Sequence, residues 1–463
     1  MAEDVRFEKR MSDSDALMWG IEKDPLLRST ITSVSIFDRA PDGDRVIDKL
    51  DRGSRLIPRL RQRVVSAPFS PAPPRWIIDP NFDLRYHLRF ATAPGDGSLR
   101  ALLDFVEPLA MQGFDRARPL WEFTVVDGLA DGRAAMVQKI HHAITDGVGA
   151  VRLAMVLLDL ERDPPDDTSP MPDAPEPDEP GWLERIVGSA RHEQRRNFGI
   201  ARRSVLNVAR LVGDPVGAGR QGAANVTSIG RLLAPAFEPM SPIMGGRSLS
   251  MRFDPMVVPL GELKAAARRV EGGKLNDAFV AGVAGGLRRY HEAHGTPVES
   301  LRMTMPINVR TGETAALAGN QFVPARFAVP VGLADPVDRI RAVQGLVVQQ
   351  RAEPSLGFVE GISGILTRLP TTVATGVFGR MLKGIDFVTS NVPGSPIPVF
   401  LAGGRLEAQF AFGPLSGSAA NVTLLSYLDE CQLGVNTDPA AVPDPERFLS
   451  CLEEGFDEVR KIA

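Results

Sequence analysis

The residues of this chain best suited to chemistry lie in one short segment, His141-His142-Ala143-Ile144-Thr145-Asp146-Gly147. A neutral imidazole, with a reference pKa near ~6.5, can accept a proton from a hydroxyl near neutral pH. Deprotonating a hydroxyl in this way allows it to attack a thioester, and no covalent enzyme intermediate is needed. The segment therefore predicts general-base catalysis. A buried, hydrogen-bonded histidine pair near a turn is an equally good interpretation of the segment by itself.

The other residues of the segment have supporting chemistry. We expect the carboxylate of Asp146 to anchor the loop beside a cationic partner, and Gly147 to let the chain enter the next helix. A metal held by His141, His142 and Asp146 is a weaker alternative, because neighbouring side chains on an extended backbone point to opposite faces.

The sequence lacks the signatures of several other enzyme classes. The sequence contains no G-x-S-x-G or G-x-x-x-x-G-K-[ST], so a serine-hydrolase elbow and a P-loop nucleotide site are unsupported. His291 and His294 form H-E-A-H, which has the wrong spacing for a two-histidine zinc helix. No metal and no resident cofactor are expected.

The elements around the histidine pair can be predicted from periodicity. Residues 121–126 alternate apolar and polar side chains and precede two Asp-Gly pairs, which indicates a strand and a reversal. Residues 133–140 can return as the paired strand. Residues 150–160 are apolar on nearly every helical face and predict a buried helix. The histidines are thus expected on a strand-to-helix connection, where rigid elements present reactive side chains to a cleft.

The later part of the chain alternates between the two element types. A helix is expected from near Asn276 to Gly295, with Gly282, Gly285 and Gly286 permitting close packing. Strands are expected within 301–310, 323–331 and 385–395, a hairpin within 421–435 and a final helix over 445–463. The alternation predicts an α/β or α+β body that is built twice.

Composition divides the chain into four parts. Residues 161–180 alternate proline with acids and predict an exposed linker. Residues 181–252 carry many arginines among recurring apolar residues, which predicts a basic helical connection. We interpret it as a solvated helical face, with a patch that attracts membranes or phosphates as the alternative. The flanking ranges, 1–160 and 253–463, are the predicted N-terminal and C-terminal lobes.

Overall composition excludes several classes of protein. With 463 residues and a formal charge of −4, the chain has no whole-protein field for gathering nucleic acid. Cys431 and Cys451 fit neither a disulfide framework nor a thiolate zinc site. The first twenty residues lack the apolar core of a signal peptide, and no run reaches the roughly 18 apolar residues of a membrane span. A cytoplasmic protein, soluble or peripheral at a membrane, is expected.

Six blocks of the sequence resemble one known family in their order along the chain. They are FDLRYHLR at 82–89, PLWE at 119–122, HHAITDG at 141–147, LNDAFVAG at 275–282, SNVPGS at 390–395 and GPLSGSAANVTLLSY at 413–427. The sequence is similar to the bacterial wax ester synthase/diacylglycerol acyltransferase family, within the chloramphenicol acetyltransferase-like superfamily. The opening MSDSDALMWG differs from the family's usual opening, where a proline tends to precede the Asp-Ala pair.

The resemblance implies two chloramphenicol acetyltransferase-like lobes with a tunnel between them. It assigns the general base to His142, which matches the second histidine of the family motif, and a supporting role to His141. It also implies that Asp146 pairs with an arginine, for which Arg310 at the end of a predicted strand is the candidate.

Further residues of the matched blocks are candidate contacts with the substrate. Asn276 and Asp277 match the family's Asn-Asp pair and are expected to shape the wall of the active site, although a helix N-cap would explain Asn276 almost as well. Ser390 and Asn391 could donate hydrogen bonds to a developing oxyanion, or could simply end a strand. Pro119, Leu120 and Trp121 are candidates for substrate binding, with core packing as the favoured alternative.

The resemblance implies an acyltransferase that moves a long-chain acyl group from acyl-coenzyme A to a lipid hydroxyl. The acceptor would be diacylglycerol, giving triacylglycerol, or a fatty alcohol, giving a wax ester. The alternatives are a non-catalytic acyl-lipid binding protein of the same fold and an acyltransferase for a non-lipid acceptor. Association with the inner face of a membrane or with lipid inclusions is plausible for such apolar substrates. Neither a nucleic acid nor a specific protein partner is inferred.

Overall fold

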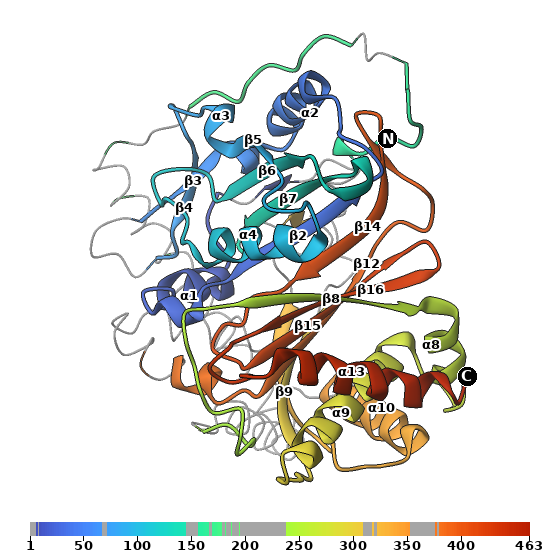
Figure 1. The fold of residues 1–463 in the computed structure, drawn as a ribbon. Coiled ribbons are helices and arrows are strands. Elements are labelled where there is room, and N and C mark those ends of the chain that lie inside the picture. The colour runs from blue at the N-terminus through green and yellow to red at the C-terminus, as the bar shows by residue number, and fades with distance from the viewer. Residues whose placement is uncertain are drawn as a thin grey trace, which may run out of the picture.

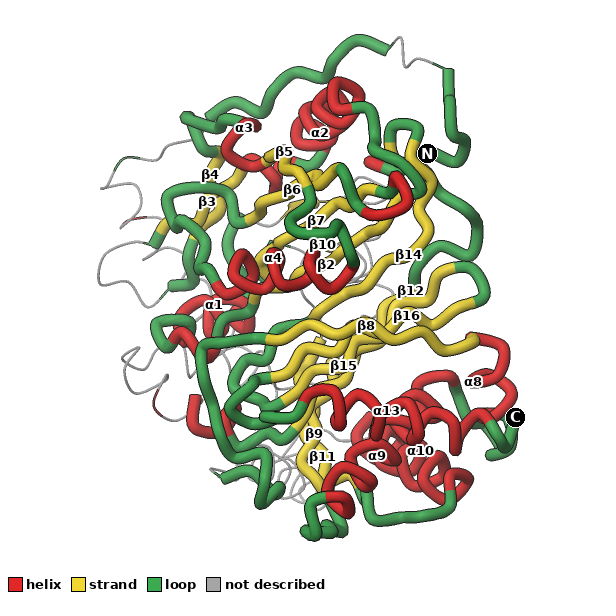
Figure 2. Tube along the Cα trace, viewed as in Figure 1, coloured by secondary structure: helices red, strands yellow, loops and turns green. Residues whose placement is uncertain are grey.

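The computed structural model describes residues 6–7, 9–66, 72–144, 156–165, 169–177, 181, 187, 194, 238–308, 317–318, 322–351, 376 and 379–463. These residues form two large mixed sheets with helices packed against them, one above the other in Figure 1. Figure 2 shows the same arrangement, with the longer C-terminal helices gathered beside the lower sheet. The predicted mixed α/β fold with two lobes is confirmed.

The first sheet contains the strand that leads to the histidine pair. Its six strands are, in spatial order, β13 (Phe400–Leu401), β14 (Gly404–Phe412), β2 (Thr30–Phe37), β7 (Ala134–His141), β6 (Trp121–Asp127) and β5 (Leu88–Thr92). β7 pairs in antiparallel register with both neighbours, Thr30 opposite His141 on β2 and Trp121 opposite Ile140 on β6. The predicted strand, reversal and returning strand before the motif are confirmed.

The second sheet is built from the later part of the chain. Its six strands are, in spatial order, β11 (Phe322–Val329), β9 (Leu301–Asn308), β12 (Phe387–Pro393), β15 (Ala420–Tyr427), β16 (Glu430–Thr437) and β8 (Arg252–Pro259). β12 runs parallel to both neighbours, and β15 and β16 form the predicted hairpin. Two short pairs complete the strands: β1 (Arg6–Phe7) with β10 (Leu317–Ala318), and β3 (Gln62–Val65) with β4 (Arg75–Ile78).

The two sheets do not follow the order of the chain. β13 and β14 come from the C-terminal part of the sequence but complete the first sheet, where β14 pairs with β2. The end of β14 passes very close to the second sheet, because a Cβ atom at Gly434 of β16 would lie 2.1 Å from the carbonyl oxygen of Ala411. Only glycine permits this approach of two backbones. Phe253 of β8 adds a ring stacked on Phe412, with centroids 4.2 Å apart.

The helices bury apolar stripes against the sheets. The first sheet is covered by α2 (Gly43–Leu56) on one face and α4 (Leu99–Met111) on the other. Asp42 and Ser98 cap these two helices by accepting hydrogen bonds from backbone N–H groups of the first turn. Around the second sheet lie α8 (Leu260–Ala267), α9 (Leu275–Ala293), α10 (Pro336–Arg351) and α13 (Pro445–Arg460) (Figure 1). Further helices among the described residues include α1 (Asp13–Ile21), α3 (Leu84–His87), η1 (Pro25–Leu27), η2 (Pro58–Arg61) and η3 (Ala130–Gly132).

Close packing of α9 against its neighbours follows from its glycines, as predicted. A Cβ atom would lie 2.5 Å from the Phe456 ring if placed on Gly282, and 2.6 Å from the Leu452 backbone if placed on Gly286. Both contacts are with α13, so small residues on α9 set the distance between the two helices.

The linker and the two predicted helices next to it are described only in part. Residues 161–165 and 169–177 belong to no helix or strand and are mostly exposed. Arg52 and Arg55 of α2 donate hydrogen bonds to linker carbonyls at 2.8–3.1 Å, which ties the linker to the first lobe. Most of the predicted buried helix at 150–160 and most of the basic connection at 181–252 lie outside the described residues. The four predicted domain ranges therefore stay predictions.

Candidate active site

The two histidines of the motif follow directly from β7 and are held by backbone bonds on both sides. The N–H of His141 donates to the carbonyl of Leu120 at 3.0 Å, and the N–H of His142 donates to the carbonyl of Ser29 at 2.9 Å. The N–H of Ile144 returns to the carbonyl of His141 at 2.9 Å and closes a turn. The side chain of His142, half-buried, is thus carried by a turn whose backbone is fixed to two neighbouring segments.

The ring of His141 has a partner at each nitrogen. Its Nδ1 accepts a hydrogen bond from the N–H of Ala143 at 3.0 Å, so the ring proton of the neutral form sits on Nε2. Nε2 then donates to Oε1 of Glu22 at 2.9 Å. The residue is only 1% exposed, and the edge of Trp19 lies against it with ring centroids 5.5 Å apart. Both nitrogens are therefore engaged in holding the turn.

Glu22 is a site residue that the sequence analysis missed. It follows α1 as its C-cap, and its side chain is only 9% exposed. Burial by itself would raise the pKa of this carboxyl, but the hydrogen bond from His141, the N–H of Ser29 at 2.6 Å and the charge of Arg116 lower the pKa below its ordinary value. The side chain is therefore an ionised carboxylate at neutral pH.

The sequence gives little reason to select Glu22. It lies 119 residues from His141, and an acid at the C-terminal end of a helix is unfavourable for the helix dipole. That local misfit is the one hint in the sequence, because it implies that something outside the helix stabilises the charge.

Lys139 is a second buried charge near the motif. It lies two residues before His141 on β7 and therefore on the same face of the sheet. It is 3% exposed, and its amine lies 4.6 Å from the centroid of the Phe114 ring. Burial lowers the pKa of this amine, Glu122 opposes the shift, and Arg89 and Arg28 add to it. A buried lysine thus lies just before the motif, with its amine against an aromatic ring.

The segment with Pro119, Leu120 and Trp121 belongs to the core. All three are buried, and the indole N–H of Trp121 donates to the carbonyl of Leu60 at 2.8 Å. The buried ring of His87 stacks on Trp121 with centroids 4.6 Å apart. Core packing, the favoured alternative, describes these contacts, and a role in substrate binding stays a prediction. The segment also reaches the motif, through the carbonyl of Leu120 that accepts the N–H of His141.

Asn276 and Asp277 lie in the first turn of α9. The helix begins at Leu275 with Lys274 as its N-cap, so the interpretation of Asn276 as the N-cap is wrong. Asn276 instead points its amide at the sulfur of Met305 on β9, 3.4 Å away. The carboxylate of Asp277 accepts the N–H of Lys274 at 2.8 Å, which satisfies one of the free donors at the helix start.

Ser390 and Asn391 lie on β12 where the second sheet opens. β12 pairs with β9 only at Phe387 and Val388, although it continues to pair with β15 as far as Pro393. Ser390 is half-buried and Asn391 is exposed. One edge of β12 therefore parts from β9 next to the predicted oxyanion donors, and Asn276 contacts the same strand β9 through Met305. A role for Ser390 and Asn391 at an oxyanion stays a prediction.

Three predicted site residues, Asp146, Gly147 and Arg310, lie outside the described residues. Among the residues that are described, no group of three His, Cys, Asp or Glu could hold a metal ion. His291 of the H-E-A-H segment is bound instead to the carbonyl of Leu287 and the hydroxyl of Ser241, at 2.8 and 2.7 Å. In the described part of the chain, none of the helices combines the length and apolar character that a bilayer span requires.

Comparison with known families gives two matches. Residues 11–279 match the wax ester synthase/diacylglycerol acyltransferase catalytic domain, and residues 318–460 match the WS/DGAT C-terminal domain. The first match includes the histidine pair, and the second includes β12, β14, β15 and β16.

Individual proteins and structures agree with these matches. A Mycobacterium tuberculosis protein named for diacylglycerol O-acyltransferase activity is 38% identical over 100% of this chain and 94% of its own. The structure of a wax ester synthase/diacylglycerol acyltransferase from Marinobacter aquaeolei has a TM-score of 0.61 at 22% identity and covers 97% of this chain and 98% of its own. The first condensation domain of the calcium-dependent antibiotic synthetase has a TM-score of 0.58 at 16% identity, with 98% and 95% covered.

Proposed function

The chain belongs to the wax ester synthase/diacylglycerol acyltransferase family of acyltransferases, and we propose that it moves a long-chain acyl group from acyl-coenzyme A to the hydroxyl of diacylglycerol or a fatty alcohol. The names of its relatives support diacylglycerol as an acceptor, and the name of the Marinobacter enzyme supports both. The observation that carries the proposal is the fixed turn at the end of β7, which holds a half-buried His142 by its backbone while the ring of His141 is fully engaged.

In the proposed reaction the neutral imidazole of His142 is the general base. It takes the proton from the acceptor's O–H as the oxygen attacks the thioester carbonyl. The carbon–sulfur bond of the tetrahedral intermediate then breaks, and the departing thiolate takes the proton from the imidazolium. The products are an ester and free coenzyme A, and the imidazole is neutral again. General-base assistance contributes roughly 10²–10⁴ in rate, so positioning of the two substrates supplies much of the remainder.

Other residues complete the proposal. We propose that Asp146 anchors the motif loop with Arg310, that Gly147 leads the chain into the next helix, and that Ser390 and Asn391 stabilise the oxyanion. Asn276, beside Met305 on β9, is proposed to shape the wall near the parting of β9 and β12. The acyl thioester and the alcohol are proposed to meet in a tunnel between the lobes.

The proposal is tested by following free thiol release from palmitoyl-coenzyme A. Purified protein is incubated with either dipalmitoylglycerol or hexadecanol, and His142→Ala is compared with wild type. We expect the His142 variant to lose roughly 10²–10⁴ of the rate. His294→Ala is the matched control, because His294 lies at the far end of α9 beside Asp444 and should leave the rate unchanged.

Three results would count against the proposal. Equal rates for wild type and His142→Ala would remove the mechanism. If neither dipalmitoylglycerol nor hexadecanol supports thiol release, a non-catalytic acyl-lipid binding protein is favoured. If thiol is released only with a non-lipid alcohol or amine, an acyltransferase for a non-lipid acceptor is favoured.

The proposal extends to a lipid surface, because acceptors this apolar collect in membranes and lipid inclusions. The basic stretch of residues 185–231 is the proposed point of attachment. Replacing Arg202 and Arg203 by glutamate should reduce co-sedimentation with anionic liposomes without lowering thiol release from detergent-dispersed substrates. Unchanged co-sedimentation would contradict this part of the proposal.

A further inference from the structure

The segment of residues 22–30 contacts both histidines of the motif. Oε1 of Glu22 accepts hydrogen bonds from Nε2 of His141 at 2.9 Å and from the N–H of Ser29 at 2.6 Å. The carbonyl of the same Ser29 accepts the N–H of His142 at 2.9 Å. One carboxylate oxygen therefore connects the ring of the first histidine to the backbone of the second.

The position of the ring proton of His141 follows from the hydrogen bond that its Nδ1 accepts. Because Nδ1 of His141 accepts the N–H of Ala143, the ring must present its proton to Glu22. Glu22 can accept it because the carboxyl stays ionised in spite of its burial. A charge-assisted bond of this kind is stronger than a neutral one, and it fixes the ring plane as well as its position.

The opposite side of the segment is attached to the second lobe. Asp24 pairs with Lys383 at 2.5 Å, and the hydroxyl of Ser416 donates to the carbonyl of Arg28 at 3.3 Å. Leu382 packs on the small apolar cluster that includes Leu27. The segment is therefore fixed on this side as well. If the hydrogen bond between Glu22 and His141 is lost, the segment cannot shift to restore its contact with the motif.

From this geometry we propose that Glu22 is a positioning residue for the transfer reaction. It acts through the ring of His141 and the backbone of Ser29 to fix the turn that carries His142. The inference rests on the proposed function, in which His142 is the base. A misplacement of about 1 Å at a reacting group can reduce a rate by roughly 10²-fold. Loss of the hydrogen bond between Glu22 and His141 is therefore expected to lower the rate of transfer measurably.

The test uses the full-length protein and the thiol-release assay with two Glu22 variants. Glu22→Ala removes both hydrogen bonds, and we expect kcat to fall about 10–100-fold while KM for palmitoyl-coenzyme A changes by less than about threefold. Glu22→Gln keeps an acceptor oxygen of the same shape and should recover most of this loss, to within about 2–10-fold of wild type. Glu446→Ala, which removes an exposed carboxylate on α13, is the matched control and should leave kcat unchanged.

A double variant distinguishes positioning from general destabilisation. Because Glu22 acts through His141, Glu22→Ala should lower kcat much less in a His141→Ala background than in wild type. Multiplicative losses, or a kcat for Glu22→Ala within about twofold of wild type, would overturn the inference. If Glu22→Ala does not fold, the same test uses Glu22→Gln. Its effect on kcat is then compared between the wild-type and His141→Ala backgrounds.

The spectroscopic readout needs no turnover. Nitrogen NMR of the wild-type protein should show His141 as the neutral tautomer with its proton on Nε2, and Glu22→Gln should shift that resonance. An inactive wild type or a fully active His142→Ala would refute the proposed function and leave this contact intact. Activity that depends on His142 but not on Glu22 would refute only the positioning role.

Discussion

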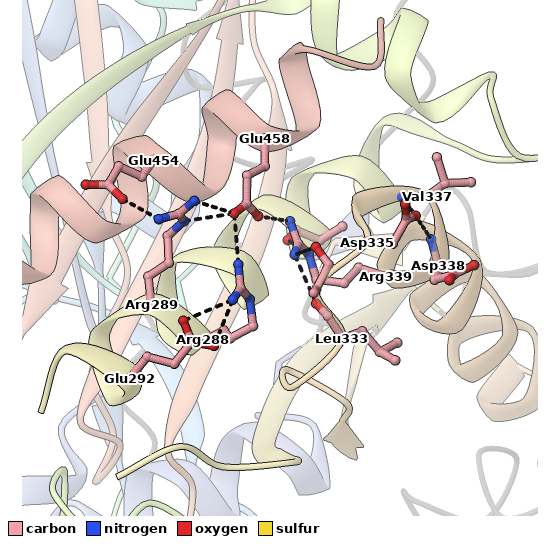
Figure 3. A network of polar contacts seen from close by, with 12 residues as sticks. Arg288, Arg289, Glu292, Leu333, Asp335, Val337, Asp338, Arg339, Glu454 and Glu458 are labelled. Carbon is pink, nitrogen blue, oxygen red and sulfur yellow. Dashed lines mark hydrogen bonds and ion pairs between the residues drawn. The ribbon is translucent and has the colours of Figure 1, made fainter. Parts of the chain in front are cut away.

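Two buried charge clusters of this protein differ in how many partners hold them. In the helical layer beside the second sheet, Glu458 of α13 accepts hydrogen bonds from three arginines, Arg288, Arg289 and Arg339, at 2.5–2.9 Å (Figure 3). In the first lobe, the carboxylate of Glu22 accepts one side-chain hydrogen bond, from Nε2 of His141, and one backbone hydrogen bond, from the N–H of Ser29. The first cluster joins α9, α10 and α13, whereas the second fixes one turn at the end of a strand. The comparison suggests that redundancy serves stability, and that a single directed bond serves the placement of a reactive group.

The helical cluster is built to keep a buried guanidinium satisfied. The side chain of Arg339 is fully buried and also donates to the carbonyls of Ala281, Leu333 and Ala334 at 3.0–3.2 Å. Burial alone would raise the pKa of Glu458, but the hydrogen bond and charge of Arg339 and the neighbouring arginines lower it. A buried pair of this kind costs most when only one partner is removed.

The largest expected effect is therefore on stability and comes from Glu458→Ala. This change leaves Arg339 buried without a carboxylate, and we expect the free energy of unfolding to fall by about 3–5 kcal/mol. Urea denaturation measures it. Below the unfolding transition, kcat in the thiol-release assay should stay near wild type, in contrast to the loss of kcat expected for Glu22→Ala.

The dependence on pH sharpens this prediction. Because the folded-state pKa of Glu458 is lowered, its contribution to stability is complete above about 4.5, the reference pKa, and is lost as the pH falls through the folded pKa. Wild type and Glu458→Ala should thus converge in acid. Glu446→Ala, at a carboxylate that is 78% exposed, should cost no more than about 1 kcal/mol. A loss for Glu458→Ala as small as this would contradict the comparison.

Most of the fold was predictable because it rests on local patterns. The alternation of Trp121, Phe123 and Val125 predicted β6, and the glycines of α9 predicted its close packing against α13. The crossing of β14 into the first sheet was not predictable, because strand pairing between residues 32–37 and 406–412 leaves no local pattern.

The candidate site was predictable only where its residues are adjacent in sequence. The motif gave His141 and His142, but Glu22 reaches them only through the folding of α1 against the end of β7. Its position at a helix C-terminus opposes local preference, and such conflicts between local and tertiary preference are expected at functional sites. The start of α9 shows the opposite limit, because a plausible cap at Asn276 was wrong by two residues.

The smallest expected effect concerns Lys139, the charge beside the motif that has an aromatic partner. Burial lowers the pKa of its amine, so the charged form costs free energy in the folded state. Lys139→Met keeps the apolar stem and places a sulfur near Phe114, which offsets the lost cation–π contact. We expect the free energy of unfolding to rise by about 0.5–2 kcal/mol at pH 7, the range common for stabilising substitutions.

The sign of the pH dependence distinguishes this explanation from better packing alone. Between the lowered folded pKa and the reference value near ~10.5, the unfolded chain binds more protons than the folded one, so wild type gains stability as the pH rises through that window. The advantage of Lys139→Met should therefore shrink between pH 7 and pH 10 in urea denaturation. Lys9→Met, at an exposed lysine, is the control for the substitution itself. A pH-independent advantage would mean that the charge of Lys139 is stabilised after all, and that the motif, like the helical layer, is surrounded by well-compensated charges.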